Sequence, residues 1–253
     1  MIEKKKIINY LLLIILLSFT VRTVKVLTNP IVCRDSILYI KMADTWAELG
    51  AKEALVGYIP PAYVFILAMG QKYLDLRPET VGNIVGVILG SLIPLAVFWI
   101  AFSLFDCYKL ALIAALLAAI QPYLIRTSTL ILRDAVYVPM LSCAFAFAAS
   151  AIKSKSILNW CLFAVFIAIA AMSRYEGLFV VPIFFIWALY ELFTSKQSLL
   201  KRFRYLALSS CMVIFIYFGL TYMVKISLSE ATYSLWSSTD ISSLEPPVVM
   251  RAK

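Results

Sequence analysis

Histidine is absent from this 253-residue sequence. Its absence excludes Ser–His and Cys–His nucleophilic machinery, and it excludes any metal centre that histidine would ligate. Any acid–base chemistry must therefore rest on carboxylates.

Charged residues are also scarce. They make up 15% of the chain and hydrophobic residues 63%, against roughly 25% and roughly 45–50% in soluble domains. A water-soluble core cannot absorb that apolar excess, and no room is left for a sizeable soluble domain. The composition therefore predicts an all-α integral membrane protein.

The five cysteines indicate neither a metal site nor a disulfide framework. Cys143, Cys161 and Cys211 lie within apolar runs, where they are expected to be small buried side chains. Cys33 and Cys107 fall at loop positions on opposite predicted sides of the membrane, so they are not expected to pair.

Seven apolar runs approach the roughly 20 residues that a membrane-spanning helix needs. The first follows a basic start and lacks a small-residue cleavage site, so it is predicted to be an uncleaved signal anchor, with Arg22 and Lys25 snorkelling to the interface. The third is short and can continue through "RTSTLIL". The predicted spans are Ile7–Leu27, Val81–Leu104, Leu110–Ile125, Ala135–Ile152, Ser156–Met172, Gly177–Phe193 and Tyr205–Val224.

Two shorter helices are predicted in the first outer loop, residues 28–80. After Asp35, apolar residues recur at helical spacing up to Gly50, which predicts an amphipathic helix on the membrane surface. The segment Pro60–Gly70 is too short to span and begins with Pro-Pro, so it is expected to lie at the interface; the simplest interpretation of the two prolines is a helix start.

The short loops on the N-terminal side are densely basic. By the positive-inside rule the N-terminus is cytoplasmic and the tail 225–253 is outside. The membrane itself is expected to be a bacterial inner membrane. All Asp and Glu residues except Glu3, Asp106 and Glu191 then fall on the outer side. The basic residues of the N-terminal side are Lys4, Lys5, Lys6, Lys109, Lys153, Lys155, Lys196, Lys201, Arg202 and Arg204.

Two Arg–Asp pairs recur in similar outer settings, Arg34–Asp35 in "CRDSILYI" and Arg133–Asp134 in "LRDAVY". A third outer element is Arg174 in the tight turn "SRYEG". Each has a structural alternative: both aspartates could be helix N-caps, Arg34 and Arg133 could be interfacial anchors, and Arg174 could form a local ion pair with Glu176.

The order of these features resembles the GT-C class of polytopic glycosyltransferases, in particular relatives of dolichyl-phosphate-mannose–protein mannosyltransferase and lipid A aminoarabinose transferase. The resemblance covers about residues 1–224. Its features occur in the same order as in the family: an outer Asp ("RDSILY"), a surface helix, "GYIPPAY", "LRDAVY" and "SRYEG". Family members usually continue for several more spans, so the chain is expected to hold a truncated core.

The resemblance implies transfer of a sugar from a polyprenyl-phosphate carrier to an acceptor glycan, lipid or protein at the outer face, with membrane lipid as the other partner and no nucleic acid. Asp35 matches the family's general base, and Asp134 matches an acid that shapes the acceptor site or a metal site. Arg174, Arg34 and Arg133 match residues that hold the carrier phosphate. No cofactor is indicated firmly; a divalent metal ion is left open.

Two other functions remain open. One is transport, by a lipid-carrier flippase or small permease, which should show interrupted spans and buried polar pairs; the sequence shows neither clearly. The other is a catalytically inactive core that binds a partner.

Overall fold

The computed structural model describes residues 2–28, 33–55, 59–154 and 156–180, together with Pro182, Ile183, Ile186 and Gly219. The described part of the chain is helical and has no strand, as predicted. Its elements are α1 (Ile2–Thr28), α2 (Arg34–Leu49), α3 (Ala51–Ala54), α4 (Pro61–Leu74), α5 (Pro78–Phe105), α6 (Tyr108–Ile120), α7 (Pro122–Thr129), α8 (Asp134–Ser154), α9 (Ile157–Ser173) and the 3₁₀ turn η1 (Tyr175–Phe179).

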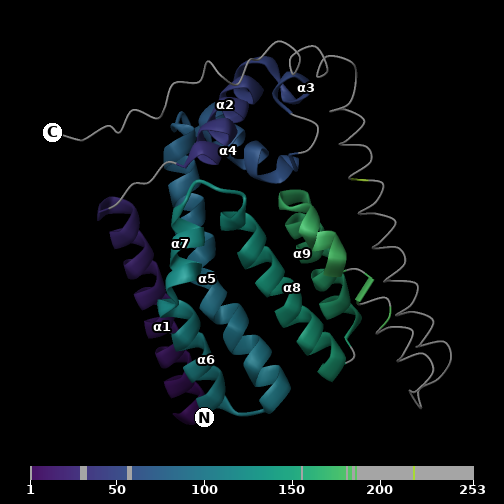
Figure 1. The fold of residues 1–253 in the computed structure, drawn as a ribbon. Coiled ribbons are helices and arrows are strands. Elements are labelled where there is room, and N and C mark those ends of the chain that lie inside the picture. Colours follow the sequence, from purple (N-terminus) through teal and green to yellow (C-terminus); the bar gives the residue numbers. More distant parts are fainter. Residues whose placement is uncertain are drawn as a thin grey trace.

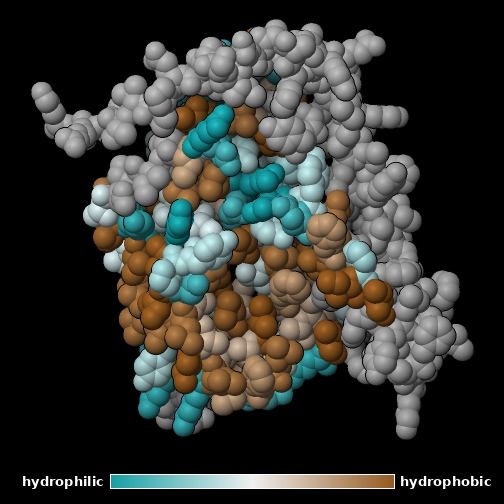
Figure 2. Space-filling model, viewed as in Figure 1, coloured by the Kyte–Doolittle hydropathy of each residue, from teal (hydrophilic) through white to brown (hydrophobic). Residues whose placement is uncertain are grey.

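The long helices form an up-and-down bundle, and α2, α3 and α4 lie together across one of its ends (Figure 1). Helix α5 packs on α1, α6 and α8, and α9 packs on α8. Large apolar side chains such as Leu13, Leu16, Ile113 and Leu117 face outward. Figure 2 shows the result on one face: an apolar belt, with hydrophilic residues gathered near both ends. The chain is therefore an all-α, multi-pass membrane protein.

The predicted spans are reproduced in part. Helices α1, α5 and α8 are long and apolar enough to cross a membrane, and α9 is apolar but shorter. The predicted third span does continue past residue 125, but it bends by 52° between α6 and α7. The span predicted over Gly177–Phe193 begins in the 3₁₀ turn η1 and lies mostly outside the described residues, and of the span predicted over Tyr205–Val224 only Gly219 is described.

Helices α2 and α4, here called the roof, confirm the two short helices predicted in the first loop. Tyr39 of α2 meets Tyr63 of α4 edge to face, with ring centroids 5.6 Å apart, and the Gln71 amide donates to Asp44 at 3.0 Å. Buried apolar residues of both helices share one cluster with Val81, Ile131, Ala135 and Val136. The roof is thereby packed directly onto α5 and the start of α8.

The prediction that Arg22 snorkels to the interface is wrong. Arg22 is completely buried on α1. Its guanidinium donates to the Ser18 and Ser128 hydroxyls, at 2.6 and 3.0 Å, and to the Ala119 carbonyl at 3.3 Å. The side chain points into the bundle because the interrupted α6–α7 segment offers it oxygen acceptors there, which lipid does not.

Three glycines on α5 allow α7 and the following loop to approach closely. Gly82, Gly86 and Gly90 follow one another at four-residue spacing and so lie on one face of the helix. A Cβ at Gly86 would fall well inside 3.0 Å of the Ser128 carbonyl oxygen, and one at Gly82 would reach 3.0 Å from Ile131. Stripes of small residues commonly provide such close packing between membrane helices.

The opposite end of the bundle is tied by a separate exposed ion pair. Lys153, in the last turn of α8, pairs with Asp106, just after α5. The Lys153 ammonium also lies 5.4 Å from the centroid of the Phe102 ring, which stacks on Tyr108. This end carries the side chains that the basic-loop pattern assigned to the cytoplasm.

Candidate functional site

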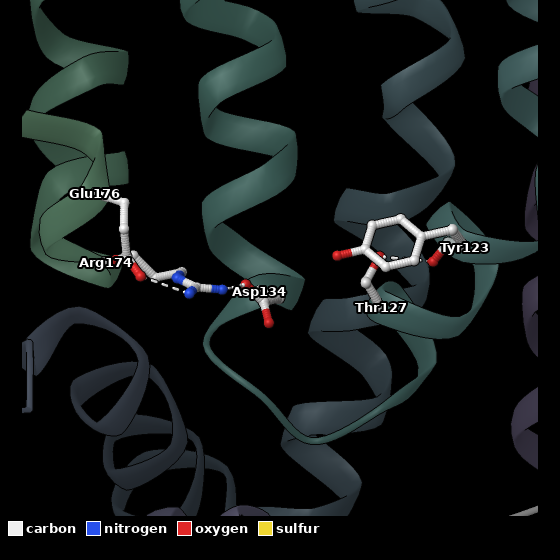
Figure 3. A network of polar contacts seen from close by, with 5 residues as sticks. All are labelled: Tyr123, Thr127, Asp134, Arg174 and Glu176. Carbon is white, nitrogen blue, oxygen red and sulfur yellow. Dashed lines mark hydrogen bonds and ion pairs between the residues drawn. The ribbon is translucent and has the colours of Figure 1, made fainter. Parts of the chain in front are cut away.

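Arg174 joins the end of α9 to the start of α8. Its Nη1 pairs with the Asp134 carboxylate, and its Nη2 donates to Glu176 Oε1 at 2.6 Å. Figure 3 shows the guanidinium reaching from α9 to Asp134, with Glu176 on its other side and Tyr123 and Thr127 on neighbouring α7. Two predicted site residues from distant parts of the sequence are thus in direct contact.

The turn that presents Arg174 is tight for a steric reason. The Arg174 amide continues the α9 hydrogen bonds to Ala170, at 2.9 Å, and the Gly177 amide then donates to the Arg174 carbonyl at 3.0 Å. A Cβ on Gly177 would lie 2.9 Å from the Ala171 backbone. Only glycine lets the chain fold back this closely, and that fold brings Glu176 beside the guanidinium.

The interpretation of Asp134 as an N-cap is wrong. The Arg133 carbonyl accepts the first helical bond of α8, from the Tyr137 amide at 3.0 Å, so Arg133 holds the N-cap position. Asp134 is the first residue of the helix. Its carboxylate is engaged by Arg174 across the helix pair.

Asp35 is not an N-cap either. The residue at the N-cap of α2 is Cys33, whose amide donates to the Ser36 hydroxyl at 3.2 Å. Asp35 lies in the first turn of α2 with an exposed side chain. Its carboxylate takes part in no hydrogen bond or ion pair among the described residues.

Tyr39 connects both Arg–Asp pairs. It lies one helical turn after Asp35 and is buried against Ala135 and Val136, the residues that follow Asp134. Burial raises the pKa of Tyr39, and the nearby charges of Arg133, Asp35, Asp134 and Arg174 also act on it. Four of the five predicted site residues, all but Arg34, therefore lie near enough to this phenol of α2 to act on it electrostatically.

The three arginines of the site differ in what they bind. Arg174 is held by two carboxylates, and their hydrogen bonds raise its pKa further above the ordinary value. Arg133 acts electrostatically on Tyr39, Tyr175 and Glu176, yet neither it nor exposed Arg34 forms an ion pair within the described ranges. Arg133 is therefore a partly buried cation of the site whose guanidinium pairs with no carboxylate in the described part of the chain.

Glu176 remains ionised at neutral pH. The hydrogen bond from Arg174 lowers the pKa of Glu176 from 4.5 to about 2. A carboxyl with so low a pKa is a poor proton acceptor near pH 7, so Glu176 is a poor candidate for a general base.

Among the described residues, no group of three or more Cys, Asp or Glu side chains comes together that could hold a metal ion. Asp134 and Glu176, the two carboxylates that approach each other, share Arg174, whose positive charge opposes a cation there.

Sequence reasoning missed Tyr39 and Tyr137, although a signal was present. Both Arg–Asp motifs end in tyrosine, one turn after the aspartate. The Arg174 guanidinium carbon lies 5.6 Å from the centroid of the Tyr137 ring, so each tyrosine lies beside the charges of the site.

A comparison with protein families adds a finding about the chain as a whole. The family described as dolichyl-phosphate-mannose-protein mannosyltransferase matches residues 59–219. That range includes α4 to α9 with Asp134 and Arg174, whereas Asp35 and α2 precede it. None of the curated proteins compared matches the chain.

Proposed function

The chain belongs to the dolichyl-phosphate-mannose-protein mannosyltransferase family, and from that premise we propose that it moves a sugar from a polyprenyl-phosphate carrier to an acceptor hydroxyl at the outer face of the membrane. Membership makes it a membrane glycosyltransferase of the GT-C type. The carrier, the side of the membrane and the role of each residue belong to the proposal.

The observation that carries the proposal is the meeting of Asp134 and Arg174 under the roof, with Arg133 and Asp35 acting on the same Tyr39. A lipid-linked sugar phosphate brings its leaving group with it. The protein then needs a base for the acceptor and cations for the phosphate, and both are available at this end of the bundle.

In the proposed reaction Asp35 takes the proton from the acceptor hydroxyl. The acceptor oxygen forms a bond to the anomeric carbon of the sugar while the bond from that carbon to the phosphate oxygen breaks. The polyprenyl phosphate leaves with the electron pair, so negative charge grows on its oxygens. General-base help of this kind contributes roughly 10²–10⁴-fold.

Arg133 is the first choice for the carrier phosphate, because its partly buried guanidinium pairs with no carboxylate in the described part of the chain; Arg34 is the second. Guanidinium groups bind phosphate oxygens bidentately. Arg174 already donates to two carboxylates, those of Asp134 and Glu176, so its proposed task is to hold Asp134 in place at the acceptor side. No step is assigned to a metal ion.

The topological part of the proposal puts the roof outside and the N-terminus in the cytoplasm of a bacterial inner membrane. Its support is the basic side chains of the opposite end, including Lys109 and Lys153, which suit a cytoplasmic face.

Purified full-length protein in nanodiscs tests the proposal with a radiolabelled polyprenyl-phosphate sugar and a mixture of acceptor lipids, glycans and peptides. Transfer of label from the carrier, weakened strongly by Arg133→Gln and weakly by Arg77→Gln, supports it. Arg77 is an exposed arginine before α5 and serves as the matched control. Carrier movement between leaflets without transfer would favour the flippase, and neither activity would favour an inactive core.

A further inference from the structure

Arg22 is a costly side chain at its position. It lies six residues before the end of α1, or about 9 Å along the axis at about 1.5 Å per residue, within a candidate membrane span. It is completely buried, and its partners among the described residues are two hydroxyls and two carbonyls, with no carboxylate. A charged side chain within a membrane span usually has a functional role.

The break between α6 and α7 explains why a side chain with several donors is needed here. Pro122 carries no N–H, and the chain bends there by 52°, so the last carbonyls of α6 lose regular helical donors. Within a membrane such carbonyls must be satisfied by the protein. Arg22 donates to one of them, Ala119, at 3.3 Å, while the Gln121 side chain caps α7 by accepting from the Leu124 amide at 2.6 Å.

Arg22 also holds the far end of α7. Its Nε donates to the Ser128 hydroxyl at 3.0 Å. Ser128 and Arg22 both lie against the glycine stripe of α5: a Cβ on Gly90 would lie 2.8 Å from both Ser128 Oγ and Arg22 Nε. Ser128 is thus bound to a cation while it packs closely on the surface of α5.

The connection from α7 to Asp134 is short and hydrogen-bonded. Only residues 130–133 separate Thr129 from Asp134. The Leu132 amide donates to the Leu130 carbonyl at 2.8 Å, and the Ala135 amide donates to the Leu132 carbonyl at 2.9 Å. Leu130 and Ile131 are buried, so movement of α7 is passed on to the start of α8.

We propose that Arg22 is a positioning residue for the transferase site: by joining Ala119 to Ser128 it fixes the direction of α7, and through the 130–133 loop it sets the place of Asp134. The role of Asp134 in transfer rests on the function proposed above; the mechanical link from Arg22 to Asp134 does not.

Three variants test the link in the full-length protein. Arg22→Met removes the charge and all donors, Arg22→Lys keeps the charge but loses the planar fork, and Ser128→Ala removes one acceptor. Lys25→Met is the matched control, since Lys25 is a cation one turn further along α1 with no hydrogen bond or ion pair within the described ranges. All four variants are measured in lipid nanodiscs.

The first readout is hydrogen–deuterium exchange. Arg22→Met and Ser128→Ala should speed exchange of the amides of residues 124–129 and 135–137, and leave those of α9 unchanged; Lys25→Met should change neither. Equal exchange in wild type and Arg22→Met would overturn the proposal. If Arg22→Met does not insert, Arg22→Lys and Ser128→Ala decide the same question.

The second readout is transfer per folded molecule. A displacement near 1 Å costs roughly 10²-fold in rate, so Arg22→Lys should lower kcat by roughly tenfold or more with little change in the KM for the carrier. Faster exchange with an unchanged kcat would reduce Arg22 to a structural staple and overturn the positioning role. If wild-type protein shows no transfer, the proposed function fails, and the exchange of residues 135–137 alone then decides the link.

Discussion

Arg174 and Asp134, forty residues apart, form a partly buried ion pair that joins the end of α9 to the start of α8. Their side chains are 28% and 20% exposed. Lys153 and Asp106 pair at the other end of the bundle with 44% and 68% exposure. Each end of the bundle therefore holds an ion pair between helices, partly buried at one end and exposed at the other.

A double-mutant cycle should separate the two pairs. Asp134→Asn with Arg174→Gln should show a coupling free energy of about 1–3 kcal/mol, because contacts between enclosed charges are not additive. Asp106→Asn with Lys153→Gln should show about 0–1 kcal/mol, as exposed pairs do. Denaturant unfolding in detergent measures both. Equal coupling at the two ends would contradict the view that enclosure strengthens the Arg174 pair.

Stability should depend on Glu176 in acid. Its pKa is lowered from 4.5 to about 2 in the folded protein, so the stabilisation it gives is complete above pH 4.5 and is lost as the pH falls toward 2. Glu176→Gln should flatten the fall in Tm across this window and change Tm little at pH 7, since Glu176 is 46% exposed. Glu48→Gln on α2 is the control. A fall as steep in Glu176→Gln as in wild type would place its source elsewhere.

The proposed role of Asp35 depends on proton transfer and not on helix capping. Asp35→Asn removes a proton acceptor while leaving Cys33 and Ser36 to begin α2 as before. The variant should insert and unfold like wild type, yet lose roughly 10²-fold or more in transfer rate. Glu48→Gln, an exposed carboxylate on the same helix, should keep full activity. Undiminished transfer by Asp35→Asn would remove Asp35 from the site.

The sequence predicted the helices of the bundle and the roof well, and it predicted their polar contacts poorly. Hydrophobic run length and helical spacing were enough to find α1, α5, α8 and the roof, because both are local properties. Two partners of Arg22, Ala119 and Ser128, come from α6 and α7, about a hundred residues away. No local pattern could therefore show that its side chain turns inward.

The glycines of α5 are an intermediate case. The sequence "GNIVGVILG" displays Gly82, Gly86 and Gly90 at four-residue spacing, which predicts a close helix contact but not its partner. Similarly, the two Arg–Asp motifs predicted that their side chains share one end of the bundle. They did not show which arginine binds a carboxylate, because that depends on the turn that Gly177 permits.

Orientation in the membrane can be tested at the two ends of the bundle. In a cysteine-free background, Glu48→Cys on the roof should react with a membrane-impermeant maleimide added outside intact cells, and Lys109→Cys should react only after permeabilisation. Both positions are exposed, so protection reports sidedness. The reverse pattern would place the candidate site in the cytoplasm and exclude an outer-face reaction.

The turn at Gly177 should be intolerant of even one methyl group. An alanine Cβ there would lie 2.9 Å from the Ala171 backbone, which cannot move away as a flexible side chain could. The turn must therefore open, and Glu176 and Arg174 move with it.

Gly177→Ala should lower Tm and reduce transfer per folded molecule by roughly tenfold or more, since small displacements in a site are costly. Phe179→Ala is the control: this side chain in the same turn is 72% exposed, and its loss should leave transfer unchanged. Because Gly177→Ala and Arg174→Gln disturb the same contact with Asp134, the double variant should be little worse than the more damaging single one. Fully additive losses in transfer rate would mean that Gly177 acts on the site by a route other than Arg174.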